Sequence, residues 1–151
     1  MYSRKIVALS FLLATFSIAA YSDSEKLKTF RIGTGGVSGT YYPVGKLIAR
    51  AISNPPGSDL CKDVPDCGVP GLLAVAQVSN GSVSNVNAIA NGTLEAGLVQ
   101  SDVAYWAHIG TGVFSTQPAV SDLRSITNLY PEHLHIIARR DGGINAVSDL
   151  R

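Results

Sequence analysis

The residues of this chain best suited to bind a ligand are glycines and hydroxyl side chains clustered at residues 33–41. The segment reads G-T-G-G-V-S-G-T-Y and follows a β-prone run at residues 29–32. Glycine permits positive φ and has no Cβ, so a ligand can come close to the backbone there. An amphipathic pattern that starts near Thr40 predicts a helix directly after the glycines.

A helix that starts after such a turn is suited to bind an anion. Its first N–H groups have no intrahelical acceptor, and the aligned peptide dipoles give this end a partial positive charge. A strand, a glycine turn and a helix start together therefore favour a carboxylate or a phosphate. A tight turn without a ligand explains residues 33–41 equally well, so both interpretations stay open on this segment alone.

Two later turns repeat the arrangement. A β-prone run at residues 72–79 leads into Asn80-Gly81-Ser82, where Ser82 is a candidate N-cap for a helix. A short apolar run at residues 96–99 leads into Gln100-Ser101-Asp102, which opens a third helix. In α/β proteins, ligands bind beyond the carboxyl ends of parallel strands. Three polar turns that each precede a helix therefore predict one site for a small anion.

The apolar pattern predicts an α/β fold. One face of the first helix is apolar, at Val44, Leu47, Ile48 and Ala51. Residues 124–129 and 135–138 are predicted to form two further strands, and residues 147–151 the opening turn of a helix. Strands that alternate with helices indicate a mainly parallel sheet with flanking helices.

Composition excludes some classes of function. The chain has 12 Lys and Arg against 11 Asp and Glu, with no basic stripe, so nucleic acid is not expected as a partner. With 46% hydrophobic and 15% charged residues, the chain can build a folded core.

The N-terminus predicts export. Arg4 and Lys5 precede an uncharged apolar run at residues 6–20 that ends in small residues, the pattern of a cleaved signal peptide at residues 1–20. The run is shorter than the ~20 residues of a typical membrane span. An uncleaved anchor is the alternative. The expected location is the periplasm.

The two cysteines, Cys61 and Cys67, are expected to pair. In an exported protein, an even number of cysteines at short spacing favours a disulfide. A zinc site is the less favoured alternative, because no C-x-x-C sequence or nearby histidine completes it.

At four blocks the chain resembles the TAXI family of solute receptors, the TRAP-associated extracytoplasmic immunogenic proteins. The blocks are R-I-G-T-G-G-V-S-G-T-Y-Y-P-V-G at residues 31–45, V-S-N-G-S-V-S-N-V at 78–86, L-V-Q-S-D-V-A-Y-W-A at 98–107 and L-Y-P-E-H-L-H-I-I-A-R at 129–139. They occur in the family's order and cover nearly all of the expected mature chain.

The resemblance implies a type II periplasmic binding protein, in which two α/β lobes close on a solute. Such a receptor delivers a small carboxylate, glutamate or a related acid, to a TRAP membrane transporter, and it is not an enzyme and needs no cofactor or metal. Residues 21–138 would form the first lobe, without its C-terminal return segment, and residues 139–151 the start of the crossover to a second lobe that is mostly missing. Full-length members are about twice as long, so the resemblance implies weak binding by this chain alone.

The resemblance also assigns contact residues. Donors from the first turn would be Thr34, Gly35, Gly36, Ser38 and Thr40. Tyr41 would wall the pocket, and Ser82 would donate to the carboxylate. The third side would comprise Gln100, Ser101 and Asp102, with Asp102 pairing with a substrate ammonium group or acting only as an N-cap. Tyr105 and Trp106 are expected in the core.

Three other interpretations compete with this resemblance. A Rossmann-type nucleotide-binding enzyme has the same strand, glycine and helix order, but Ser38 stands where its third glycine belongs. A hydrolase lacks a G-x-S-x-G elbow, and His133 and His135 are expected to be a surface pair rather than metal ligands. A truncated, non-functional receptor fragment is the third.

Overall fold

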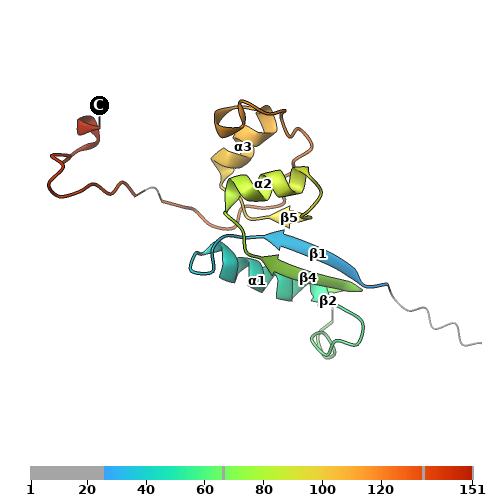
Figure 1. The fold of residues 1–151 in the computed structure, drawn as a ribbon. Helices are drawn as coiled ribbons and strands as arrows, with labels where there is room; N and C mark the ends of the chain where they lie inside the picture. Colours follow the sequence, from blue (N-terminus) through green and yellow to red (C-terminus); the bar gives the residue numbers. More distant parts are fainter. Residues whose placement is uncertain (1–25, 66, 134, 151) are drawn as a thin grey trace, which may run out of the picture. The chain divides into compact units, whose positions relative to one another are not determined.

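A computed structural model describes residues 26–65, 67–133 and 135–150 (Figure 1). The predicted signal peptide at residues 1–20 lies outside this described part. The chain divides between Gln100 and Ser101 into two compact units, and each is described by itself. In the described residues, no helix combines the length and the apolar character that a membrane crossing requires.

The first unit is built on a three-stranded parallel sheet. Its strands are β1 (Lys28–Gly33), β4 (Leu72–Gln77) and β5 (Ala96–Gly97), in the order β4-β1-β5. Phe30 lies opposite Ala74, and Ile32 lies between Ala76 on one side and Ala96 on the other. The predicted α/β architecture with a parallel sheet is confirmed.

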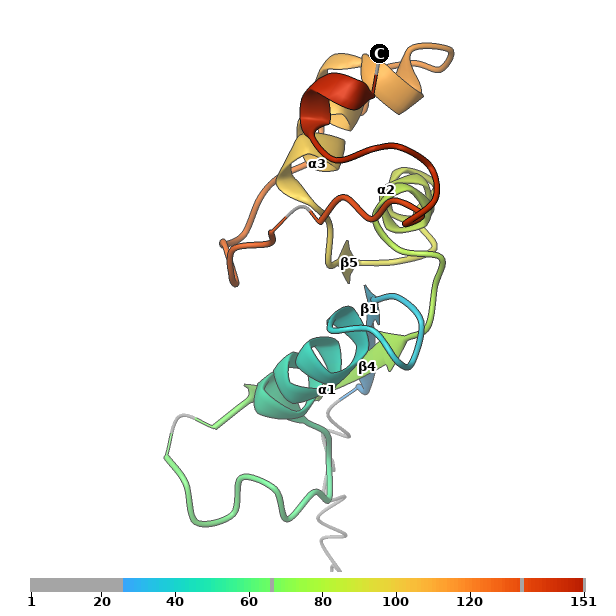
Figure 2. The ribbon, with the colours of Figure 1, turned by 90° about the vertical axis from the view of Figure 1, so that its left-hand side faces the viewer.

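Two helices cover opposite faces of this sheet. They are α1 (Tyr41–Ile52) and α2 (Ser82–Ala90), seen on either side of the strands in Figure 2. Right-handed crossovers require this, because the chain moves from β1 to the strand on one side and then back to the strand on the other. Alternate residues of β1 accordingly face different helices: Ile32 packs in the core beneath α1, whereas Gly33 faces Asn85 of α2.

The core lies between the sheet and α1. Its buried members are Ile32, Ala49, Ala74 and Leu98. The predicted apolar face of α1 was partly wrong, because Leu47 is 69% exposed and Ala51 is exposed as well. The helix turns Gly45 towards the sheet instead, so closely that a Cβ at this position would lie 2.4 Å from Cγ2 of Thr34.

A loop with a disulfide connects α1 to β4. It contains the short parallel strands β2 (Ser53–Asn54) and β3 (Val69–Pro70). Cys61 and Cys67 are joined in a disulfide, with their Cα atoms 5.2 Å apart. Ser53 anchors the start of the loop, since its buried Oγ donates to the carbonyl of Ala49 and accepts from the N–H of Ala74.

The second unit contains α3 (Ser101–Ile109) and two short 3-10 helices, η1 (Gly112–Phe114) and η2 (Val147–Asp149). The helix α3 packs against η1, and the buried residues here are Val103, Ala107 and Phe114. Gly112, with φ of 55°, lies against the indole of Trp106, which is partly buried as expected. Tyr105 is 61% exposed, so its expected place in the core was wrong.

The two strands predicted after residue 120 were also wrong. Residues 124–129 and 135–138 form no strand, and Ile126, Ile136 and Ile137 are 83%, 65% and 92% exposed. A β-prone run becomes a strand only where a neighbouring strand takes up its N–H and C=O groups. Within the described residues, no strand pairs with either segment.

Candidate functional site

The glycine turn leaves β1 at Thr34, which is buried and committed to the fold. Its backbone N–H and its Oγ1 both donate to the carbonyl of Gln77, at 2.9 and 2.6 Å. These bonds tie the carboxyl end of β1 to that of β4. Thr34 was predicted to donate to a solute, but neither donor is available, so the structure gives it a supporting role.

The turn itself presents unused donors. The carbonyl of Gly36 accepts from the N–H of Gly39 at 2.9 Å, which closes a tight turn over residues 36–39. Within the described residues, the N–H groups of Gly36, Val37, Ser38 and Thr40 donate to no acceptor. A Cβ at Gly36 would meet nothing within 4 Å, so the turn borders open space. These groups can therefore reach a solute.

The two hydroxyl groups of the turn are also uncommitted. Thr40 precedes the first residue of α1, but its side chain caps no helical N–H. Ser38 is exposed, and its hydroxyl has no partner in the part of the chain that is described. Gly35 is buried, and its carbonyl accepts from the N–H of Ser79 at 3.5 Å, so Gly35 joins the turn to the exit of β4.

The second and third predicted turns meet the first at one hydroxyl group. Oγ of Ser82 accepts from the backbone N–H of Gln100 at 3.0 Å and lies 3.5 Å from the hydroxyl of Tyr41. Gly81, with φ of 85°, takes the N-cap position, so Ser82 is the first helical residue of α2 and not its cap. Because Oγ of Ser82 accepts from Gln100, its own O–H remains a donor.

The remaining predicted contacts, Ser101 and Asp102, belong to the second unit. Both are exposed in the first turn of α3, and Oδ1 of Asp102 accepts from the N–H of Val103 at 2.8 Å. The carboxylate thus lies at the positive end of a helix, as expected for an N-terminal acidic residue. Of the third turn, only Gln100 is joined to the other two within the first unit.

Sequence reasoning missed two residues that support the turn. Oγ of Ser79 donates to the carbonyl of Thr34 at 2.8 Å. Asn85 is fully buried, and its Nδ2 donates to the carbonyls of Thr34 and Leu98, both at 2.8 Å. The sequence signal for Asn85 is a polar residue beside Val86, on the apolar side of a short helix. Its partners are 51 and 13 residues away, so the sequence alone does not reveal them.

A shallow hollow of about 410 Å³ lies next to this support. It is lined by Gly33, Gln77, Val78, Ser79, Asn80, Ser84, Ala88, Thr93 and Leu94. None of the predicted contact residues lines it. Its polar groups are all uncharged, so it offers hydrogen bonds but no ion pair.

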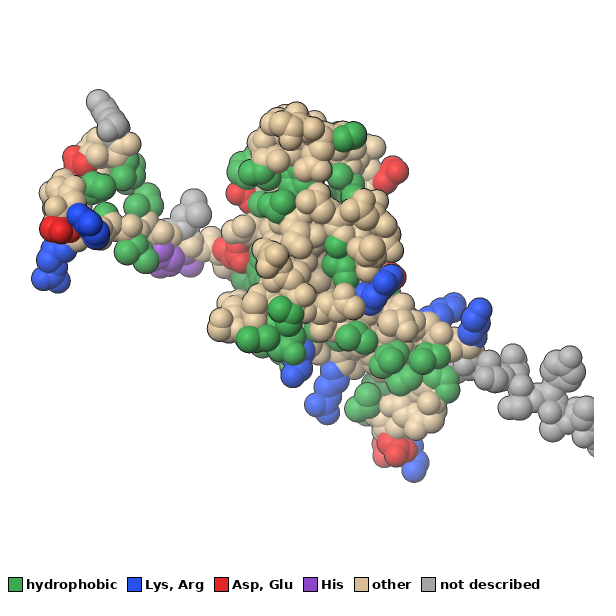
Figure 3. Space-filling view, in the orientation of Figure 1, with side chains coloured by type: hydrophobic (Ala, Val, Ile, Leu, Met, Phe, Trp, Pro, Cys, Tyr) green, Lys and Arg blue, Asp and Glu red, His purple; other side chains and the backbone are tan. Residues whose placement is uncertain are grey.

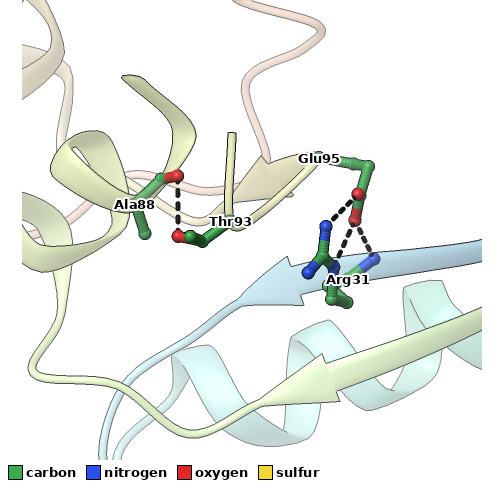
Figure 4. A network of polar contacts seen from close by, with 4 residues as sticks. All are labelled: Arg31, Ala88, Thr93 and Glu95. Carbon is green, nitrogen blue, oxygen red and sulfur yellow. Dashed lines mark hydrogen bonds and ion pairs between the residues drawn. The ribbon is translucent and has the colours of Figure 1, made fainter. Parts of the chain in front are cut away.

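Arg31, the charged residue just before the turn, forms an ion pair with Glu95 (Figure 4). The carboxylate of Glu95 accepts from the backbone N–H of Arg31 at 2.6 Å and from its guanidinium at 3.0 and 2.5 Å. These hydrogen bonds, the guanidinium's first, lower the pKa of Glu95 to about 2. Residues 32–45 carry no charge. An anion at the turn would therefore be held by backbone and hydroxyl dipoles.

No group of three or more His, Cys, Asp or Glu side chains in the described residues is arranged to hold a metal ion. His133 and His135 are exposed. Figure 3 shows histidine side chains, in purple, on the surface. The disulfide takes up both cysteines.

The geometry of the first unit is thus a parallel sheet whose strand exits carry uncharged hydrogen-bond donors. The sequence matches the NMT1-like family over residues 32–151. The match begins inside β1 and includes the glycine turn and the helices α1, α2 and α3. Because it covers most of the sequence, the chain belongs to the NMT1-like family, whose members are periplasmic-binding-protein-like and are binding proteins rather than enzymes.

Proposed function

We propose that this chain is an extracytoplasmic receptor of the TAXI type, which captures a small carboxylate and delivers it to a TRAP membrane transporter. Membership of a binding-protein family supports a periplasmic solute-binding role. The observation that carries the proposal is the set of unused N–H groups at Gly36, Val37 and Ser38, beside a helix start.

Carboxylate chemistry fits these donors. An ionised carboxylate is an acceptor only, with about four lone-pair positions on two oxygens. N–H groups of the turn can bind one oxygen, and the hydroxyls of Ser38 and Thr40 the other. Hydrogen bonds to an ionised acceptor are roughly twice as strong as neutral ones. The positive end of the α1 dipole adds to this attraction.

The other predicted contacts complete the proposal. Tyr41 walls the site and Ser82 donates its O–H to the solute; the hydroxyls of these two side chains lie 3.5 Å apart. Gln100 holds Ser82 in place through its N–H. Export by the signal peptide at residues 1–20 places the receptor in the periplasm.

The test is a titration of the ¹⁵N-labelled chain with L-glutamate, followed by NMR. We expect the amide signals of residues 36–38 to move with a dissociation constant near 1 mM, which corresponds to about 4 kcal/mol of binding free energy. Succinate should act similarly, because it also carries carboxylates. L-glutamine controls for the side-chain carboxylate and sodium sulfate for any anion. If glutamate and succinate move no signal of residues 34–41 at 20 mM, or sulfate moves them equally, the proposal is wrong.

A further inference from the structure

We infer that Asn85 is the positioning residue of this carboxylate site: it sets the distance between the glycine turn and the Ser82–Gln100 pair while adding no charge. The inference rests on the proposed function, and its test separates the two.

Asn85 connects the exits of two strands. Its side chain is fully buried on α2, and both hydrogens of its Nδ2 are used, one on the carbonyl of Thr34 and one on that of Leu98. Thr34 is the last residue before the glycine turn. Leu98 lies two residues before Gln100, whose N–H binds Ser82. Both halves of the site are therefore held by one amide group.

The exit of β4 is tied to the same point. The carbonyl of Thr34 also accepts from Oγ of Ser79, which in turn accepts from the N–H of Gly81 at 3.0 Å. Gly81 precedes the first residue of α2. The Thr34 carbonyl at the end of β1 thus accepts from Ser79, which follows β4, and from Asn85, which also binds Leu98 after β5. The start of α2 is joined to this group through the bond from Gly81 to Ser79.

Two glycines leave room for this side chain. A Cβ at Gly33 would lie 2.4 Å from Oδ1 of Asn85, and one at Gly97 would lie 2.9 Å from its Cβ. Neither glycine has positive φ, so backbone conformation does not demand glycine at either position. The close approach of Asn85 does.

The side-chain amide of Asn85 is oriented so that both of its N–H donors are paired and its oxygen is not. Oδ1 is buried without a hydrogen-bond partner in the described residues. Exchanging Oδ1 and Nδ2 would place an oxygen against the carbonyls of Thr34 and Leu98, so the observed orientation is the favourable one. A buried acceptor left unpaired is unfavourable. It is tolerated here because an uncharged side chain with two donors is what these carbonyls require.

The size and charge of Asn85 explain why other side chains would fail. A buried aspartate in its place would turn a negative charge towards two carbonyl oxygens and lie beneath a turn that binds an anion. A serine would reach only one carbonyl. Asparagine supplies both donors without opposing the charge of a carboxylate.

The experiment compares Asn85→Ala with Val86→Ala, its neighbour on α2. Val86 is also fully buried but has no polar group to bond the turn, so it controls for lost stability. The glutamate titration is repeated at a temperature at which both variants are folded. We expect Asn85→Ala to weaken binding at least fivefold and Val86→Ala by less than twofold. Equal losses, or no loss in Asn85→Ala, would overturn the inference.

A second variant decides the case in which Asn85→Ala does not fold. Asn85→Ser keeps one hydroxyl donor in place of the two amide donors and fills more of the site than alanine does. We expect a two- to fivefold loss of glutamate affinity, and an unchanged affinity would overturn the inference.

Ligand-free spectra separate the two hypotheses. Asn85→Ala, or Asn85→Ser in its place, should shift the amide signals of residues 35–38 relative to Val86→Ala even without glutamate. If those signals shift but the unmodified chain binds no carboxylate, the proposed function fails and the positioning role of Asn85 stands. If they do not shift, the positioning role fails.

Discussion

Ile32 and Ile137 occupy β-prone segments of similar character, yet the first is 3% exposed and the second 92%. The difference lies in the neighbours that each segment finds. Residues 28–33 pair along their whole length with β4, residues 32–33 also pair with β5, and α1 covers the strand, whereas residues 124–129 and 135–138 pair with no strand within the described residues. A strand therefore depends on partners for its backbone groups as much as on its own side chains.

The largest expected effect tests this comparison directly. Ile32→Ala should lower the free energy of unfolding by about 2–5 kcal/mol, because it removes core volume. Ile137→Ala should change it by about 0.5 kcal/mol or less, as for other exposed positions. Urea denaturation followed by circular dichroism measures both. A cost above about 1 kcal/mol for Ile137→Ala would show that the segment is buried in solution.

A second prediction concerns the contact between the sheet and α2. Gly33→Ala should destabilise the fold by about 1–3 kcal/mol, because its Cβ would lie within 2.8 Å of Asn85 and Leu94. Gly36→Ala is the matched control, since its Cβ would meet nothing within 4 Å. Equal urea midpoints for the two variants would contradict the packing of α2 on β1.

Reduction of the Cys61–Cys67 disulfide should have a smaller effect. The bond closes a loop with a sequence separation of only 6, so the chain-entropy model gives about 2 kcal/mol or less. Thermal unfolding with and without dithiothreitol measures the loss. The amide signals of β1 should stay in place, and their collapse on reduction would show that the loop supports the sheet.

The smallest expected effect is that of the ion pair between Arg31 and Glu95. Since the pKa of Glu95 is lowered to about 2, the pair stabilises the fold above the unfolded value near 4.5. This contribution should be lost as the pH falls from about 4.5 towards 2. Urea midpoints of the unmodified chain and of Glu95→Gln should therefore differ at pH 6 and converge as the pH falls to about 2. A constant difference would contradict the assignment.

Much of the fold was predictable from the sequence, because the signals were local. Glycines after a β-prone run, Pro43 in the first helical turn and Gly92 after α2 place β1, α1 and α2 close to where they are observed. The exposed face of α1 was not predictable. The side of α1 that faces the sheet is set by the close approach of Gly45 to Thr34. This is a tertiary contact between a helix and the end of a strand, which helical periodicity does not reveal.

The candidate site, like the fold, was only partly predictable from the sequence. The sequence indicated that Tyr41, Ser82 and Gln100 belong together, and they meet at one hydroxyl. It misassigned Thr34 and missed Asn85, because a side chain's hydrogen-bond partner depends on tertiary contacts. Helical periodicity marks Asn85 only as a residue beside an apolar stripe, while the carbonyls it binds lie in two strand exits.

The most direct test of the account is glutamate binding by Gly36→Ala, measured by NMR against Thr29→Ala at the opposite end of β1. The added methyl group enters open space at the turn, and Gly36 does not have positive φ, so the fold should be unaffected. We predict at least a fivefold loss of glutamate affinity for Gly36→Ala and none for Thr29→Ala. Unchanged binding by Gly36→Ala, with the stability intact, would contradict the assignment of the glycine turn as the carboxylate site.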